Sequence, residues 1–200
     1  LQQSFSLQGK GLHTGLDINI TFNPAPENHG YKIKRVDLEA QPILDALAEN
    51  VAGTQRGTVI SKNGVQVSTI EHAMAALYAF EIDNCLIEVD APEFPILDGS
   101  SRFYTEEIMR VGVCEQNAPK DYYIVKHKIE VKDEATGSSL IILPDDKFSI
   151  NALISFDSPV LPNQFATMND IREFPTELAA ARTFVFVCET EACIEHSLIQ

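Results

Sequence analysis

A carboxylate and an imidazole that could work together stand next to each other at Glu71 and His72. A carboxylate can accept a proton, and a neutral imidazole nitrogen is a common zinc ligand. If His72 binds a metal, Glu71 can take a proton from water on that metal, as the general base of a zinc hydrolase does. In a purely structural alternative, Glu71 completes a capping box with Ser68, and His72 is a hydrogen-bonded residue at a helix edge. The adjacent pair alone leaves both interpretations open.

A helix has to position this pair, and the surrounding sequence predicts one. Ser68 and Glu71 have the spacing of a capping box, which marks a helix start. Apolar residues then recur at the spacing of one helix face, at Ile70, Ala73, Met74 and Leu77. The opposite face carries His72 among small side chains, so another element can approach it closely.

Asp98 is a second candidate, because the chain around it is stiff. Pro92 and Pro95 fix an extended path, and Asp98-Gly99 then forms a turn that delivers the carboxylate to a defined place. Asp98 is either a turn residue or a site residue. A similar choice applies to His13, which lies among three glycines in residues 9–15. That stretch is a turn by default, since neither the P-loop nor the dinucleotide-binding spacing is present.

The elements that carry these residues read as strands followed by helices. Apolar and polar residues alternate in stretches 4–7, 18–22 and 31–38, which predicts antiparallel strands with one wet face. Asn63-Gly64 predicts a tight hairpin directly before the first helix, and residues 85–89 read as a strand after it. A second helix starts at Ser100 or Ser101, runs through Met109 and is closed by Gly112. Together they make an α+β layer pair by about residue 115.

A polar stretch around Pro119 separates two parts of the chain that each show strands followed by helix, so we expect a domain boundary there. The predicted domains are 1–116, which carries the Glu71-His72 motif, and 117–200, the first part of a second α+β domain. In the second part, strands are expected over residues 123–131, 139–143 and 148–156, and a helix over 176–181. The repeated order of strands and helix is a weak sign of internal duplication.

Composition narrows the class of protein. The formal net charge is −14 with only 15 basic residues, which argues against nucleic acid as a partner. No apolar run is long enough for a transmembrane segment, and nothing at the start reads as a signal peptide. The four cysteines lack CxxC spacing, which favours reduced thiols in a cytoplasmic protein. Cys85 and Cys188 lie in apolar runs and are predicted to be core residues, whereas Cys114 and Cys193 have no assigned role.

Several separated stretches together resemble one family, the bacterial UDP-3-O-acyl-N-acetylglucosamine deacetylases, which are zinc hydrolases of lipid A (lipopolysaccharide) synthesis in Gram-negative bacteria. The resemblance covers essentially all 200 residues. Its anchors are residues 11–15, 23–26, 68–72, 82–84, 91–100 and 181–184. Within the family, the stretch Leu7-Gln8-Gly9-Lys10 is most similar to the sequences of the Bacteroidetes branch.

The resemblance implies a role for each matched residue. His72 corresponds to the first ligand of a Zn²⁺ cofactor, and Glu71 to the general base. Thr183 corresponds to the hydroxyl residue that helps hold the tetrahedral oxyanion. Phe184 corresponds to a wall near the acyl chain of the UDP-linked acylated glucosamine substrate. Phe156 corresponds to the aromatic residue against the uracil, with a plain core aromatic as the alternative.

His13 resembles a histidine close to the family's zinc site, and Asp98 an acidic residue near the catalytic centre. The other histidines, His29, His127 and His196, match no motif and are expected at the surface. Family members carry their other two zinc ligands as a His-x-x-x-Asp pair on a later helix, which puts both side chains on one face. That motif and a later catalytic histidine are expected beyond residue 200, so this piece alone is expected to be inactive.

The implied fold is two similar α+β domains of the ribosomal S5 domain 2-like kind, each a sheet with helices on one face, and with the second domain incomplete. The active site is expected in the cleft between them. In the Bacteroidetes branch the deacetylase is often fused to a downstream 3-hydroxyacyl-carrier-protein dehydratase, so a multifunctional enzyme is expected. The rival interpretations are a non-catalytic α+β binding module and an inert structural fragment.

Overall fold

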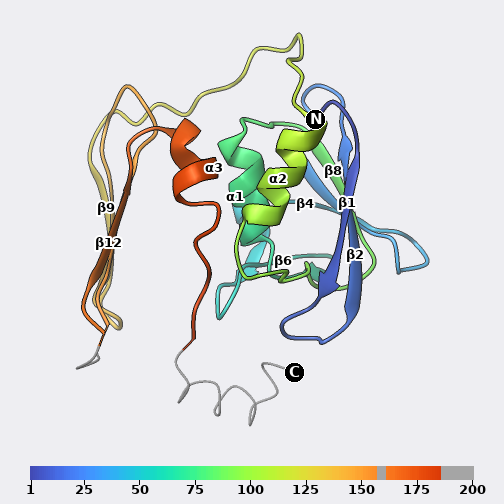
Figure 1. Ribbon diagram of the computed structural model, residues 1–200, viewed down its shortest axis with the longest axis horizontal. Helices are drawn as coiled ribbons and strands as arrows, with labels where there is room; N and C mark the ends of the chain where they lie inside the picture. The colour runs from blue at the N-terminus through green and yellow to red at the C-terminus, as the bar shows by residue number, and fades with distance from the viewer. Residues whose placement is uncertain (157–160, 186–200) are drawn as a thin grey trace. The chain divides into compact units, whose positions relative to one another are not determined.

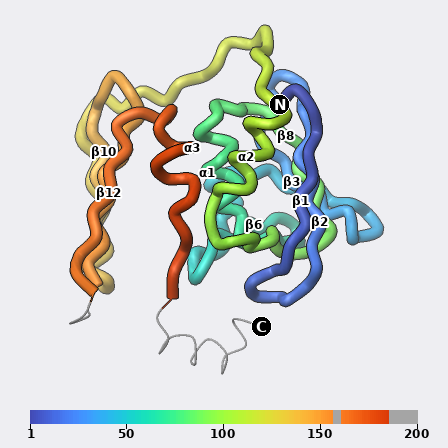
Figure 2. Tube along the Cα trace, viewed as in Figure 1, coloured from blue at the N-terminus to red at the C-terminus, as the bar shows by residue number. Residues whose placement is uncertain are grey.

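The computed structural model describes residues 1–156 and 161–185 (Figure 1). The chain forms two compact units. Unit 1 consists of Leu1–Asn117 and the segment that begins at Phe174, and unit 2 consists of Ala118–Glu173. Figure 2 lets the reader follow the chain out of unit 1 after α2, through unit 2 and back. The α+β class is confirmed, whereas the domain division and the similarity of the two domains stay predictions.

Unit 1 is built on a five-stranded sheet. Across the sheet its strands are β1 (Phe5–Lys10), β2 (Asp17–Pro24), β8 (Cys85–Val89), β3 (Tyr31–Arg35) and β4 (Ile43–Asp45). All neighbours are antiparallel except β3 and β8, which pair in parallel. The expectation of purely antiparallel strands was therefore wrong for β3. The reason is topological: β8 lies between β2 and β3, which run in opposite directions, so β8 must be parallel to one of them.

A smaller sheet leads into the helix of the candidate site. It consists of β5 (Val51–Gly53), β6 (Val59–Lys62) and β7 (Val65–Val67), and a 3₁₀-helix (Ala48–Asn50) precedes β5. Asn63 and Gly64 have φ values of 54° and 80°, as a type I′ turn requires, so the predicted tight hairpin is confirmed. Neither β4 nor β5 was expected from the sequence, because each is only three residues long.

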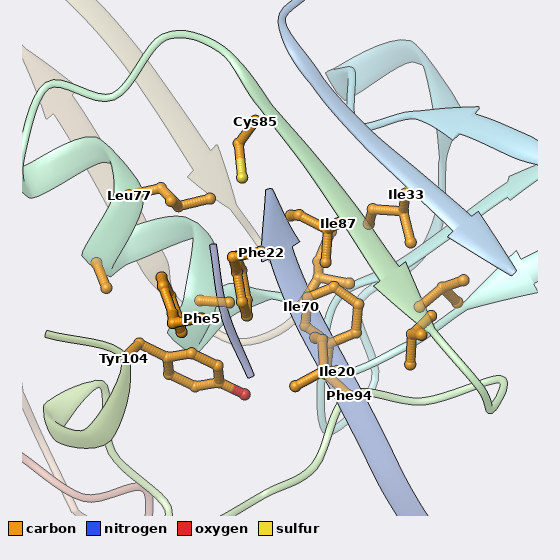
Figure 3. Packing of buried hydrophobic residues seen from close by; sticks show 14 of the residues in the cluster. Phe5, Ile20, Phe22, Ile33, Ile70, Leu77, Cys85, Ile87, Phe94 and Tyr104 are labelled. Carbon is orange, nitrogen blue, oxygen red and sulfur yellow. The ribbon is translucent and has the colours of Figure 1, made fainter. Parts of the chain in front are cut away.

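Helices α1 (Glu71–Ala79) and α2 (Arg102–Val111) bury their apolar faces with the inward face of the five-stranded sheet. Figure 3 shows Leu77 of α1 and Tyr104 of α2 among the sheet residues. The rings of Phe5 and Phe22 stack at 4.7 Å, and Tyr104 meets Phe22 edge-on at 5.7 Å. Burying each such aromatic ring contributes about 2–3 kcal/mol. Both predicted helices are confirmed, and Gly112, with φ of 77°, ends the second as expected.

Unit 2 contains two antiparallel hairpins. They pair β9 (Ile129–Asp133) with β10 (Ser138–Ile142), and β11 (Ile150–Ile154) with β12 (Gln164–Met168). All residues of β9, β10 and β11 are exposed, apolar ones included. The strand expected from Tyr123 starts only at Ile129, so the first part of that prediction was wrong.

A 3₁₀-helix (Ile171–Glu173) continues into the short helix α3 (Phe174–Glu177). The helix predicted over residues 176–181 was therefore placed too late and made too long. Phe174 is the buried residue of this helix, and Ala179, which is also buried, lies two residues beyond its end. Cys85 is fully buried, which confirms it as a core residue, and Cys114 is exposed. Cys188, Cys193 and His196 lie outside the described residues.

Candidate active site

The helix that carries the Glu71-His72 pair begins at Glu71, with Ile70 as its N-cap and without a side-chain capping bond. The predicted capping box was therefore wrong. Ser68 instead donates to the carbonyl oxygen of Pro92 at 3.3 Å, and Glu71 accepts a hydrogen bond of 2.9 Å from the backbone N–H of Thr58. The cause lies in Thr69, whose positive φ of 59° excludes it from the helix and shortens the first turn.

Glu71 and His72 lie close to each other at the start of α1. The Glu71 Oε1 and His72 Nε2 atoms are 3.9 Å apart, and the two side chains are 37% and 16% exposed. This separation is too long for a hydrogen bond but allows both groups to act on one bound molecule. The Thr58 N–H fixes one carboxylate oxygen, Oε2, so Oε1 is the oxygen on the His72 side. The partial exposure leaves the pair accessible to water.

His13 reaches the same place from a distant part of the sequence. A Cβ atom built on Gly57 would lie 3.5 Å from Glu71 Oε1, 3.7 Å from Thr69 Oγ1 and 3.9 Å from His13 Nε2. These three polar atoms therefore surround one point beside the Gly57 backbone. His13 Nε2 and Glu71 Oε1 thus both lie within 4 Å of one position, and a place for His13 near a zinc site stays a prediction. The glycine at 57 has φ of 156° and presents no side chain to this point.

A buried carboxylate, Glu93, supports the His13 turn. Its side chain is fully buried and accepts hydrogen bonds from the backbone N–H groups of His13 and Thr14, at 3.0 Å each. It also accepts from the hydroxyls of Thr14 at 2.9 Å and Thr69 at 3.2 Å. Glu93 lies within the 91–100 stretch that carries the resemblance, and the sequence predicted no role for it. The available signal was a lone acid between prolines and apolar residues, a pattern that predicts burial with partners.

The Asp98 turn is a second polar cluster of unit 1. The Oδ1 atom of Asp98 accepts from the Ser100 hydroxyl at 2.7 Å, and Oδ2 lies 3.5 Å from Arg102 and 3.8 Å from Arg182. Burial alone would raise the pKa of Asp98, but the hydrogen bonds from Ser100 and the two guanidinium charges outweigh it. The pKa of Asp98 is therefore held below its usual value, and the carboxylate stays charged.

Thr183 lies against this turn. Its backbone N–H donates to the Gly99 carbonyl oxygen at 2.8 Å, and its methyl group would be 3.5 Å from a Cβ at Gly99. Ser101, two residues after Gly99, donates from its hydroxyl to the carbonyl oxygen of His72 at 2.9 Å. The short loop from Asp98 to Ser101 thus contacts both the Thr183 segment and the first turn of α1. Thr183 itself is exposed.

The two predicted substrate-binding aromatic residues and the remaining described histidines have no described contact with the Glu71-His72 pair. Phe184 follows Thr183 and is 56% exposed, whereas Phe156 belongs to unit 2 and is half-buried after β11. Their predicted contacts with substrate stay predictions. His127 is exposed and His29 is half-buried, with its Nδ1 atom 3.0 Å from the Gly30 carbonyl oxygen.

The described side chains do not by themselves complete a metal site. Within residues 1–156 and 161–185, no group of three or more His, Cys, Asp and Glu side chains could hold a metal ion. A zinc site in a protein uses at least three protein ligands. His72 is thus placed without a full ligand set in this part of the chain. In the same stretches no helix is both long and apolar enough to cross a membrane.

Comparisons with known proteins point to one family. The family model for UDP-3-O-acyl N-acetylglycosamine deacetylase matches residues 1–200. Two proteins named bifunctional enzyme LpxC/FabZ, from Bacteroides thetaiotaomicron and Porphyromonas gingivalis, are 64% and 62% identical over the whole chain. A UDP-3-O-acyl-N-acetylglucosamine deacetylase from Myxococcus xanthus is 40% identical over 96% of the chain. The chain spans 43% of the length of the two bifunctional relatives and 60% of the third.

Proposed function

Because the chain belongs to the UDP-3-O-acyl N-acetylglycosamine deacetylase family, we propose that the complete protein removes the N-acetyl group of UDP-3-O-acyl-N-acetylglucosamine in lipid A synthesis. The observation that carries this proposal is the placement of the Glu71 carboxylate beside the His72 imidazole, both partly exposed, at the start of α1. An amide hydrolase needs a base of this kind next to the bound acetyl group.

In the proposed reaction, water attacks the carbonyl carbon of the acetyl group and Glu71 accepts its proton. Glu71 then passes this proton to the amide nitrogen as the C–N bond breaks, which gives the free amine and acetic acid, and the acid loses its own proton to the amine or to water to become acetate. The bond from the Thr58 N–H holds Glu71 Oε2, so the orientation of the base is fixed before substrate binds. Thr183 is proposed to donate to the oxyanion, because it is exposed and its backbone is held by Gly99.

The remaining site residues are proposed to bind and position. His13 Nε2 and Glu71 Oε1 both lie within 4 Å of the position of a Cβ on Gly57, and Asp98 precedes Gly99, whose carbonyl oxygen holds the Thr183 backbone. Phe184 is proposed to contact the acyl chain and Phe156 the uracil. Both roles rest on the resemblance, supported by the exposure of Phe184 and the partial exposure of Phe156.

Zinc is proposed as the cofactor of the complete protein, with His72 as one ligand. When bound, the metal would polarise the acetyl carbonyl and make water more acidic. The described residues supply no three-ligand group, so they do not form a zinc site by themselves. The other two ligands are proposed to come from residues of the complete protein outside the described ranges. We also propose a cytoplasmic location for the enzyme.

The test uses the complete protein and measures release of acetate from the acylated UDP-sugar. Glu71→Ala is expected to lower kcat/KM by about 100-fold or more, and Thr183→Ala by about 100-fold. Glu49→Ala and Thr54→Ala, both at exposed positions of unit 1, are the matched controls and should keep activity. Full activity of Glu71→Ala would contradict the assignment of the base. Chelator-treated protein that is free of zinc and fully active would contradict the metal proposal.

A second activity is proposed from the relatives alone. Two proteins more than 60% identical to this chain are named as bifunctional enzymes, and the chain covers 43% of each. We therefore propose that the complete protein also carries a 3-hydroxyacyl-carrier-protein dehydratase domain. Dehydration of a 3-hydroxyacyl carrier protein by the purified complete protein tests this directly, and Glu71→Ala should leave that activity unchanged.

A further inference from the structure

We propose that Glu93 is a positioning residue that sets His13 and Thr69 around the Glu71 carboxylate. The proposal rests on the function proposed above for Glu71. Glu93 is fully buried, lies in the segment that follows β8 and does not touch the Glu71-His72 pair through any hydrogen bond described here. Glu93 would therefore affect the reaction indirectly, by fixing the positions of His13 and Thr69.

Both oxygens of Glu93 act as acceptors. Oε1 takes the His13 N–H at 3.0 Å and the Thr69 hydroxyl at 3.2 Å. Oε2 takes the Thr14 N–H at 3.0 Å and the Thr14 hydroxyl at 2.9 Å. A carboxylate is the side chain that offers two acceptor oxygens and no donor, so this arrangement requires it. In glutamine one of the two oxygens is replaced by an NH₂ group, which is a donor and would face the two donors that this oxygen accepts from.

The turn is shaped closely around this carboxylate. A Cβ atom on Gly11 would lie 2.5 Å from Glu93 Oε2 and 2.3 Å from Thr14 Oγ1, so the backbone of the turn approaches as near as a glycine allows. A buried charge is costly unless donors surround it, and here the donors come from residues 79 and 80 positions earlier in the chain. The bond geometry therefore dictates where the His13 backbone lies.

The connection to the candidate site runs through Thr69 and His13. Thr69 is a β-branched residue with φ of 59°, a strained conformation that persists only where surrounding bonds enforce it. Its hydroxyl bond to Glu93 is one such bond. The neighbouring backbone is held by two more, from the Ser68 N–H to the Pro92 carbonyl oxygen and from the Phe94 N–H to the Ser68 carbonyl oxygen, at 3.0 Å each. Thr69 Oγ1 and His13 Nε2 both lie within 4 Å of the point beside Gly57 that Glu71 Oε1 also faces. One buried side chain thus bonds to the Thr69 hydroxyl and to the backbone N–H of His13, the residue whose ring reaches that point.

The experiment uses the complete protein with Glu93→Gln as the principal variant. Asp90→Asn is the matched control, because Asp90, which follows β8, also accepts a backbone N–H, from Asn19 of β2 at 2.8 Å, and has no hydrogen bond to His13 or Thr69 among those of the described residues. With ¹⁵N-labelled histidine, the amide proton of His13 is expected downfield in the wild type and further upfield in Glu93→Gln. In Asp90→Asn it should not move. Expected kinetics for Glu93→Gln are a kcat lowered on the order of 100-fold with KM unchanged.

A second pair of variants covers the case in which Glu93→Gln does not fold. Thr14→Val removes the hydroxyl bond to Glu93 at constant size, and Thr14→Ser keeps it. Thr14→Val should lower kcat and shift the His13 amide resonance, and Thr14→Ser should restore both. The proposal is overturned if the His13 amide resonance stays in place, or if Glu93→Gln and Asp90→Asn lose the same activity. Absence of deacetylation in the wild type would remove the proposed function, while the amide resonances would still decide the role of Glu93.

Discussion

The hydroxyl of Ser101 donates a hydrogen bond of 2.9 Å to the main-chain carbonyl oxygen of His72. Ser101 is the N-cap residue of α2, yet its side chain makes no capping bond to its own helix. The bond instead ties the start of α2 to the first turn of α1. The position of the His72 backbone therefore depends on the loop that also holds Asp98 and Gly99.

Ser101→Ala removes this tie and is expected to cost about 1 kcal/mol, the usual net contribution of one hydrogen bond. The midpoint of thermal unfolding should then fall by about 2–4 °C. Ser4→Ala is the control, because the exposed Ser4 hydroxyl bonds only the Asn23 side chain, at 2.8 Å. Scanning fluorimetry of both variants measures the difference, and equal midpoints would show that the bond to His72 adds nothing.

Asp98→Asn tests the charge of the second cluster. A carboxyl whose folded pKa is lowered stabilises the protein above its unfolded pKa and loses that effect as pH falls through the folded pKa. The wild type should therefore be more stable than Asp98→Asn at pH 7, and the gap should close as pH drops below about 4. Urea unfolding at several pH values measures the gap. A gap that is the same at pH 7 and pH 3 would mean that the charge is irrelevant.

Gly11→Ala tests the closeness of the turn to Glu93. The added methyl group would meet Thr14 Oγ1 at 2.3 Å and Glu93 Oε2 at 2.5 Å, so the turn has to move. We expect a loss of about 2 kcal/mol or more in the free energy of unfolding. Gly53→Ala has open space within 4 Å and is the matched control, with an expected change within about 0.5 kcal/mol. A Gly11→Ala protein as stable as Gly53→Ala would refute the close approach.

Cys85 is expected to resist alkylation in the folded protein. Burial raises the pKa of its thiol to about 12, so at pH 8 only about one molecule in 10⁴ carries the reactive thiolate. Iodoacetamide treatment followed by peptide mass spectrometry should find Cys85 unmodified and the exposed Cys114 modified. Both should react after unfolding in guanidinium. Rapid native alkylation of Cys85 would show that β8 opens readily.

Much of unit 1 could be predicted from the sequence, because its signals are local. Alternation places Ile18, Ile20 and Phe22 on one face of β2, and all three are fully buried. The Asn63-Gly64 turn and the Gly112 helix end depend on backbone conformations that few other residues adopt. Such features need no knowledge of the rest of the chain.

The failures arise where distant residues decide the outcome. The Ser68-Glu71 spacing predicted a capping box, but the bond from Thr69 to Glu93 favours a positive φ that the spacing does not reveal. The hydrogen bonds of Glu93 itself join residues up to 80 positions apart. In unit 2 the apolar stretch around Tyr123 looked like a strand, yet no partner strand lies beside it among the described residues. The roles expected for His13 and Thr183 came from the resemblance and not from local pattern, and they stay predictions.

The return of the chain to unit 1 at Phe174 has a consequence for how the protein folds as it is synthesised. The hairpin of β6 and β7 and helix α1 are neighbours in sequence, so they can form soon after they leave the ribosome. The partner of Gly99, Thr183, emerges only after all of unit 2 has been translated, a delay on the order of seconds. Under the function proposed above, Glu71 is therefore in place before Thr183 reaches Gly99, and the nascent chain passes through a folded but half-assembled stage.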